Sequence, residues 1–224
     1  MLFKGLAFTR TNVYVDGFNL YYGAAEYTSY KWVNLAELCV QVLPDLIIHR
    51  IRYFTALVKP TPFDPHTRLR QEVYILALET LPSLTVHYGH YLQSTKSMPL
   101  ASPPLSGPRF ADVLQMEEKD SDVNIATYML VDAFRKDCDQ LIVITNDSDL
   151  AEPVRIINKE LLMPVGVFNT QTNDTARPSI QLRQVSKFNR DITSEGPESH
   201  MALSQFPPRI TDDHGHTITK PASW

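Results

Sequence analysis

Short apolar runs alternate with amphipathic segments over about the first 190 residues of the chain. The runs at 12–16 and 140–145 are rich in β-branched and aliphatic residues, which is typical of strands buried on both faces of a sheet. The same pattern predicts further strands near 49–58, 84–92, 110–116 and 164–169, and helices near 18–25, 35–43, 66–80, 121–134 and 149–160. Strands that alternate with helices predict an α/β domain, a three-layer α/β/α sandwich with a mainly parallel central sheet.

Two segments depart from this alternation. Gln93–Arg109 contains four prolines and is predicted to be a loop. After about Asp191 the sequence shifts towards Ser, Pro, His and Thr with few large apolar residues. We therefore expect one domain over residues 1–192 and a flexible C-terminal tail over residues 193–224.

The helix that begins at Asp120 or Ser121 carries an apolar stripe at helical spacing. Its members, which we expect to face the core, are Val123, Ala126, Leu130 and Phe134. Tyr14 and Trp32 are further core candidates, and His87 and His90 are interpreted as structural.

Composition limits the classes of function. The chain has 224 residues, 43% of them hydrophobic, and 21 Lys and Arg against 25 Asp and Glu, a net charge of −4. This balance excludes a strongly cationic coat, so nucleic-acid binding would have to be local. No apolar run approaches the roughly 18–20 residues that span a bilayer, and the apolar patch at 2–8 is too short for a leader peptide. We expect a cytoplasmic protein without membrane contact.

Four aspartates occupy matching places in the predicted topology. Asp16, Asp147 and Asp149 follow predicted strands, and Asp122 stands at a helix start. Because the carboxyl ends of parallel strands meet at one edge of the sheet, these carboxylates are expected to converge, and a cation would offset their repulsion. Ligands that are all oxygen favour Mg²⁺ or Mn²⁺, ions that contact phosphate. Taken singly, each Asp could instead cap a helix or form a turn, and Ser148 could also act as a cap.

Three ordered blocks carry a resemblance to a known family. Val13–Leu20 reads VYVDGFNL, Glu118–Ala126 reads EKDSDVNIA, and Ile144–Leu150 reads ITNDSDL. In order and spacing they closely resemble the signature blocks of NYN-domain proteins, the LabA-like branch of the PIN-like nuclease superfamily, over residues 12–192. The resemblance implies a PIN-like α/β/α sandwich that cuts RNA with a divalent metal.

The resemblance also implies roles for single residues. Asp16, Asp122 and Asp147 match the family's metal-binding acids, and Asp149 matches the last acid of its third block. Asn19 matches the polar residue beside the first acid, which would orient that acid or hold a metal-bound water.

Lys119 precedes the second acid as in the family. It could steady a phosphate or pair with Glu117 or Glu118, and Ser148 is a second candidate for substrate contact. Many relatives have Gly-Val where this chain has Asp120-Ser121, so Asp120 could compete as a ligand or cap the helix.

The sequence indicates an RNA-binding surface less clearly than it indicates the cluster of acids. Basic residues that could line a path for phosphates are Arg50, Arg52, Lys96, Arg109, Arg177, Arg183, Lys187 and Arg190. Tyr21, Tyr22 or Tyr91 could stack bases. Because the basic residues are scattered, an ordinary solvated surface is the favoured interpretation.

The favoured hypothesis is a metal-dependent ribonuclease that cleaves RNA by attack of water at the Asp cluster. One alternative is a non-catalytic metal- or RNA-binding regulatory module of the same fold. Another is a phosphatase with Asp16 as nucleophile, but such chemistry usually needs an acid two residues on, where this chain has Phe18. A homodimer is compatible with this kind of fold.

Overall fold

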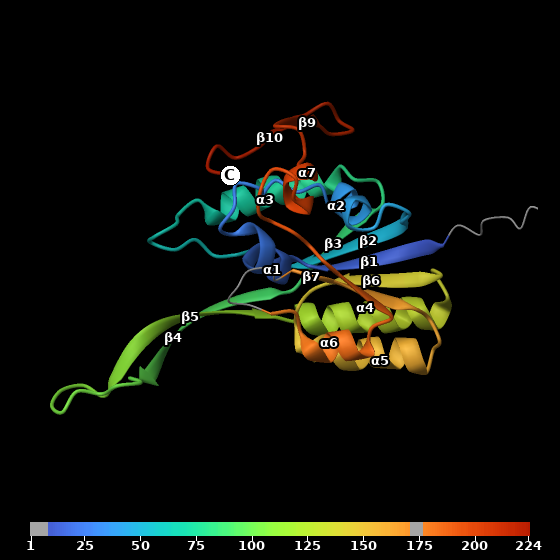
Figure 1. The fold of residues 1–224 in the computed structure, drawn as a ribbon. Helices are drawn as coiled ribbons and strands as arrows, with labels where there is room; N and C mark the ends of the chain where they lie inside the picture. Colours follow the sequence, from blue (N-terminus) through green and yellow to red (C-terminus); the bar gives the residue numbers. More distant parts are fainter. Residues whose placement is uncertain (1–8, 171–176) are drawn as a thin grey trace, which may run out of the picture.

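A six-stranded, wholly parallel sheet forms the centre of the computed structural model, which describes residues 9–170 and 177–224. The sheet has the order β3-β2-β1-β6-β7-β8 (Figure 1). Its strands are β1 (Arg10–Asp16), β2 (Ile47–Thr55), β3 (Leu84–Tyr88), β6 (Gln140–Ile144), β7 (Val165–Asn169) and β8 (Phe188–Asp191). The predicted parallel α/β/α sandwich is confirmed, and β8 and helix α6 (Ile180–Val185) are elements that the sequence pattern did not predict.

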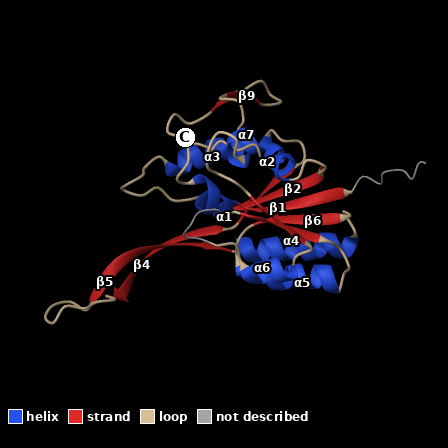
Figure 2. Ribbon diagram, viewed as in Figure 1, coloured by secondary structure: helices blue, strands red, loops and turns tan. Residues whose placement is uncertain are grey.

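Helices cover both faces of this sheet (Figure 2). One face carries α1 (Gly17–Leu20) with the π-helical turn η1 (Tyr21–Ala25), α2 (Leu35–Val42), α3 (Thr67–Glu79) and α7 (His200–Leu203). The other carries α4 (Ser121–Arg135), α5 (Ala151–Lys159) and α6. Apolar strand residues feed both layers: Val13 and Val15 pack into the first core, whereas Tyr14 packs into the second. None of the helices within the described ranges is long and apolar enough to cross a membrane.

Helix α4 faces the sheet with a different stripe from the predicted one. Val123 and Phe134 are 68% and 78% exposed, so their assignment to the core was wrong. The buried positions are Ser121, Ile125, Met129, Asp132 and Ala133. Asp132 lies in the middle of the helix face that packs on the sheet, because it has polar partners there. The stripe of apolar residues therefore lies at a different angle around the helix axis from the face that is buried.

A long two-stranded ribbon leaves the sandwich between β3 and α4 (Figure 1). β4 (His90–Pro99) pairs with β5 (Phe110–Lys119) in an antiparallel sheet of their own. The predicted loop at 93–109 is thus half strand, and the predicted strand at 84–92 breaks at Gly89. A Cβ at Gly89 would lie 2.4 Å from the carbonyl oxygen of Lys119, so the chain crosses the end of β5 where no side chain fits.

The C-terminal segment packs against the α2–α3 face instead of forming a flexible tail. It contains α7 and the hairpin β9 (Arg209–Thr211) and β10 (Thr217–Thr219). Met201 is fully buried, and the Phe206 ring lies 5.8 Å from Trp32 between centroids. A few apolar side chains therefore anchor this polar segment, and the prediction of a tail was wrong. The apolar patch at 2–8 lies outside the described residues.

Candidate functional site

The acids gather where the order of the strands reverses. β1 is followed in space by β2 on one side and β6 on the other, and ligands of open α/β sheets bind at such a switch point. Asp16 ends β1, and Asp147 follows β6 by three residues. Between them lies a hollow of about 210 Å³, lined by Asp16, Phe18, Asn19, Tyr22, Gly23, Glu118, Asp122 and Asp147.

Asp16 is the most deeply placed of these acids, with 5% of its surface exposed. Its Oδ1 accepts a hydrogen bond from the backbone N–H of Asn19 (3.0 Å), and its Oδ2 accepts one from the Thr145 hydroxyl (3.0 Å). Burial raises the pKa of Asp16 to about 7, and the nearby charges of Asp122 and Asp147 add to the effect that these hydrogen bonds oppose. The carboxyl group is therefore fixed in place yet holds a proton near neutrality.

Asp147 lies at the predicted carboxyl edge of the sheet and also caps a short helix. Its Oδ1 accepts from the backbone N–H of Asp149 (2.9 Å), which makes it the N-cap of the short 3₁₀ helix Ser148–Leu150. Its own N–H donates to the Thr145 hydroxyl (3.1 Å), so one threonine joins two of the acids. Asp149 and Ser148 are exposed and do not line the hollow, although Asp149 lies close enough for its charge to act on Asp122.

Asp122 faces the hollow from the first turn of α4. Burial, then the charges of Asp147, Glu118 and Asp149, raise its pKa to about 6. Glu118 is the lining acid that the sequence analysis missed as a site residue. Its Oε1 also accepts from the backbone N–H of Ser121 (3.2 Å) at the start of α4, and its place in the second block was the available signal.

Asn19 acts as a junction between three strand ends. Its Oδ1 accepts from the backbone N–H of Asn146 (2.9 Å) and from the Thr170 hydroxyl (2.9 Å). Its backbone N–H holds Asp16, as described above. Asn19 thus orients the first acid through the backbone, while its side chain ties the loops after β6 and β7 to α1.

Two residues of the second block, Lys119 and Asp120, do not line the hollow. Lys119 Nζ pairs with Glu117 at 2.6 Å, the structural one of its two predicted roles. Asp120 lies 2.6 Å from His90 Nδ1 and has a left-handed backbone (φ 80°) without a capping hydrogen bond. The expectation that Asp120 caps α4 was therefore wrong, and its side chain contacts the ribbon instead.

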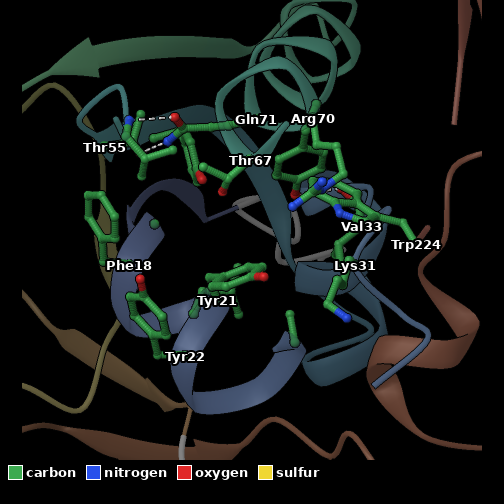
Figure 3. Close-up of a pocket in the computed structure, with 16 residues that line it drawn as sticks. Phe18, Tyr21, Tyr22, Lys31, Val33, Thr55, Thr67, Arg70, Gln71 and Trp224 are labelled. Carbon is green, nitrogen blue, oxygen red and sulfur yellow. Dashed lines mark hydrogen bonds between the residues drawn. The ribbon is translucent and has the colours of Figure 1, made fainter. Parts of the chain in front are cut away.

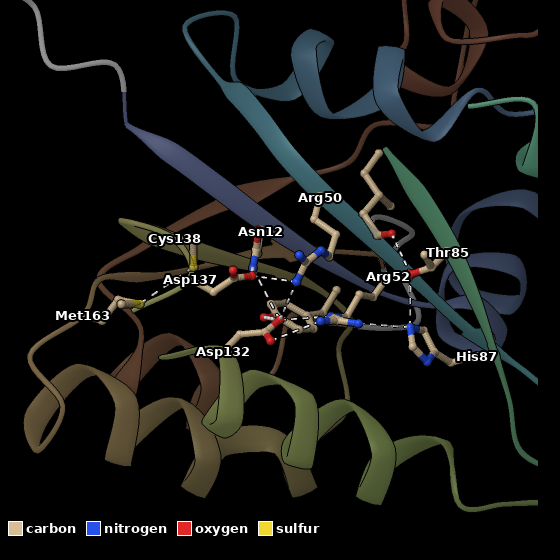
Figure 4. A network of polar contacts seen from close by, with 11 residues as sticks. Asn12, Arg50, Arg52, Thr85, His87, Asp132, Asp137, Cys138 and Met163 are labelled. Carbon is tan, nitrogen blue, oxygen red and sulfur yellow. Dashed lines mark hydrogen bonds and ion pairs between the residues drawn. The ribbon is translucent and has the colours of Figure 1, made fainter. Parts of the chain in front are cut away.

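The strongest basic candidates are already paired beneath the sheet (Figure 4). Arg52 donates to both oxygens of Asp132, at 3.0 and 3.1 Å, and Arg50 pairs with Asp137 at 2.6 Å. Asp132 is 3% exposed and also accepts from the Tyr14 hydroxyl at 2.7 Å, which with burial raises the pKa of Tyr14. These arginines stabilise the packing of α4 on β1 and β2 and are not free to bind phosphate.

The other basic candidates do not converge on the hollow. Lys96 lies on the ribbon, Arg183 on α6, and Arg190 over the Phe188 ring at the β8 edge. Of the proposed stacking residues, Tyr22 lines the hollow, and Tyr91 stands 6.0 Å from Phe18 between ring centroids. The interpretation of the basic residues as scattered surface charges agrees with these positions.

The donor set suits a hard cation, although the side chains are not closed around one. Within residues 9–170 and 177–224, no group of three Asp, Glu, His or Cys residues is arranged so that it could hold a metal ion. Beyond the effect of burial, the charge of Asp147 nevertheless raises the pKa of both Asp16 and Asp122, so these acids lie close together. Mg²⁺ keeps several waters and often takes only one or two carboxylates, so the carboxylate oxygens of this hollow are the type of donor that such an ion uses.

A parallel α/β/α sandwich with acids at its switch point defines a nuclease-type domain of the PIN-like class. The chain belongs to the NYN domain family, whose sequence model matches residues 10–187. NYN domains are generally ribonucleases that bind RNA and use divalent metals. The match is to the family and does not distinguish its LabA-like branch.

Individual proteins also resemble the chain. It is 27% identical, over 239 aligned residues, to 6-hydroxy-3-succinoylpyridine 3-monooxygenase HspA of Pseudomonas putida (strain DSM 28022 / S16), covering 96% of this chain and 75% of that protein. A solved structure of a protein of unknown function, VPA0982 from Vibrio parahaemolyticus RIMD 2210633, has a TM-score of 0.50 and 16% identity. The likeness covers 85% of this chain and 95% of that one, and it concerns the fold alone.

Proposed function

We propose that this protein is a metal-dependent ribonuclease that hydrolyses RNA phosphodiester bonds at the acidic hollow. The observation that carries the proposal is the convergence of Asp16, Asp122 and Asp147 at the switch point of an NYN domain. Burial raises the pKa of Asp16 and of Asp122, and the charge of Asp147 adds to both shifts, which indicates a pocket of negative charge that a cation would relieve.

We assign a separate role to each acid of the hollow. Asp16 and Asp147, which are joined through the Thr145 hydroxyl, would hold Mg²⁺ or Mn²⁺ together with Asp122. When bound, the ion would offset the carboxylate charge and contact the phosphate. Asp122 is only half-buried, and the oxygen of its carboxylate that does not contact the ion would accept a proton from an attacking water. Asp149 remains in the proposal as an outer acid whose charge acts on Asp122.

The test is cleavage of a labelled single-stranded RNA by the purified full chain with Mg²⁺ or Mn²⁺. We expect Asp16→Asn, Asp122→Asn and Asp147→Asn each to reduce the rate by roughly a hundredfold or more, on the scale of general-base loss. Asp139→Asn is the matched control, because Asp139 is a surface acid paired with Arg10. EDTA should abolish cleavage.

Two outcomes would refute the proposal. An unchanged rate in Asp147→Asn would mean that the hollow does not catalyse cleavage. RNA binding without cleavage, equal in the parent chain and in Asp16→Asn, would instead identify a non-catalytic RNA-binding module.

A second candidate function is oxygenation of a small aromatic compound. The similarity to the Pseudomonas putida monooxygenase favours this candidate. That similarity covers 96% of the chain and so extends past residue 187, where the NYN match ends. A monooxygenase puts one oxygen atom of O₂ into the organic product and reduces the other to water, which needs two electrons from a reductant. Oxygen uptake with 6-hydroxy-3-succinoylpyridine and a reduced nicotinamide or flavin tests this candidate, and uptake that does not depend on the pyridine would exclude it.

A further inference from the structure

A second cavity lies on the other side of the residues that wall the acidic hollow (Figure 3). It has a volume of about 90 Å³ and lies among α1, η1, β2, α3 and the C-terminal Trp224. Phe18 and Tyr22 line both the hollow and this cavity. The enclosed space is smaller than the roughly 150 Å³ cavity that holds one benzene, but it is open to solvent on one side. A single ring can therefore enter it only with its polar end in the open mouth, and a fused pair of rings is too large.

Aromatic side chains form most of the wall. At one end, Phe18 and Tyr22 lie nearly parallel with ring centroids 6.2 Å apart, and Tyr21 meets Tyr22 edge-on at 5.2 Å. At the other end, Tyr74 and Trp224 meet edge-on at 5.7 Å. Rings placed edge-on and offset around a gap favour a flat aromatic guest.

Positive charge stands at the Trp224 end of the cavity. Figure 3 shows Lys31 and Arg70 there, away from Phe18 and Tyr22. Arg70 is paired with Asp64. The Lys31 ammonium donates to the carbonyl of Thr28 (2.9 Å), and among the described residues no carboxylate lies within ion-pair distance of it. Lys31 is therefore the cation left for a ligand.

The remaining charged groups near this end carry both signs. Lys220 lies close enough to Lys31 that burial and the Lys31 charge lower its pKa. On the acidic side, Glu26 and Asp64 act on Tyr21, whose pKa is raised mainly by burial. Lys31 is the lining cation that has no ion pair among the described residues, and it can therefore pair with a monoanionic ligand.

The side-chain amide of Gln71, on the wall opposite Lys31, has its hydrogen-bond partners within the protein. Gln71 accepts from the Val58 N–H (2.9 Å) and donates to the Thr55 hydroxyl (3.2 Å) and the Ala56 carbonyl (2.9 Å). A ligand therefore finds apolar rings along its length and a charged partner only at one end.

We propose that this cavity binds a small single-ring aromatic carboxylate, with the ring against Tyr21 and Tyr22, the carboxylate at Lys31 and Trp224 as the closing wall. The geometry does not depend on RNA cleavage, since it rests on the cavity alone. Trp224 lies in the packed C-terminal segment, beyond the residues that the NYN family model matches. The site is therefore a property of this chain and not of the family fold.

The experiment is calorimetric titration of the full chain with benzoate, compared with benzamide and cyclohexanecarboxylate. We expect benzoate to bind at least tenfold more tightly than either, because only benzoate combines a flat ring with a charge. Lys31→Gln should abolish the advantage over benzamide. Lys159→Gln, an exposed lysine on the opposite face, is the matched control and should change nothing.

Trp224 is tested by two variants. Trp224→Ala should weaken benzoate at least tenfold, and Trp224→Phe, which keeps a ring in the wall, should retain most of the binding even if the alanine variant unfolds the segment. Asp147→Asn should bind benzoate as the parent chain does, so that failure of the nuclease proposal leaves this test intact.

Several results would overturn the proposal. They are no saturable binding of benzoate, equal binding of all three compounds, and an unchanged benzoate affinity in Lys31→Gln. Reduced RNA cleavage in Lys31→Gln and Trp224→Phe without any benzoate binding would also overturn it, and would assign the cavity to a base of the RNA.

Discussion

Replacement of Asp16 by Asn is expected to make the protein more stable at pH 8 while it removes RNA cleavage. The carboxyl group is buried, and its two hydrogen bonds from Asn19 and Thr145 do not fully offset the loss of water. An uncharged side chain of the same shape keeps most of these contacts without the buried charge.

The magnitude and its sign follow from the pKa of Asp16. The value is raised from 3.8 to about 7 in the folded state. Between these values the unfolded chain is ionised while the folded one keeps its proton, so stability declines as the pH rises through this window and the full cost is reached above about pH 7. A pKa difference of about 3 corresponds to roughly 4 kcal/mol, an upper limit for the gain in Asp16→Asn. Even half of this is large against a typical total of about 5–15 kcal/mol.

Urea unfolding with EDTA at pH 8 and at pH 4 measures this effect. We expect Asp16→Asn to exceed the parent chain by about 2–4 kcal/mol at pH 8, with a gap of less than about 1 kcal/mol at pH 4. Asp139→Asn controls the sign, because Arg10 holds the pKa of Asp139 below its usual value and its loss should not stabilise the protein at pH 8. A gain of equal size at both pH values, or a loss at pH 8, would refute the argument.

Three further predictions concern neighbouring features. Asp132→Ala should destabilise the protein by about 3–5 kcal/mol in urea unfolding, because it removes the carboxylate that pairs with the largely buried Arg52, whereas Arg52→Met with Asp132→Leu should cost much less. Gly17→Ala should reduce both thermal stability and RNA cleavage, since its Cβ would lie 2.7 Å from the Phe54 carbonyl oxygen. Glu118→Gln should lower the pKa of Asp122, which that charge raises, and so shift the acidic limb of the cleavage pH profile to lower pH.

The parallel sheet and the place of its acids were predictable from the sequence. Strands such as Leu141–Ile144 are continuous apolar runs, which only a sheet covered on both faces requires. In such a sheet the residue after the strand must lie at the carboxyl edge, and this places Asp16 and Asp147 without knowledge of any contact. Glu118 was harder to assign, because its position depends on where the ribbon ends against α4.

The incorrect predictions for α4 and for the C-terminal segment have one physical cause, which is that polar residues can be buried when other elements supply their partners. Asp132 is buried because Arg52 and Tyr14 supply partners from other elements, and a stripe of apolar residues cannot contain it. The C-terminal segment is mostly polar, yet single side chains such as Met201 insert into a core built by α2 and α3. Long-range pairing of this kind has no local signature in the sequence.

The two candidate sites share one short segment, and this decides how their functions can be separated. Phe18 and Tyr22 line both the acidic hollow and the aromatic cavity, so a change at either residue would alter both. Asp147 borders only the hollow, and Lys31 borders only the cavity. If occupation of the cavity acts on the acids, it must do so through the turn that carries Phe18 and Tyr22, because that turn is the common wall. Benzoate should then change the rate of RNA cleavage in the parent chain but not in Lys31→Gln, whereas independent sites would leave the rate unchanged in both.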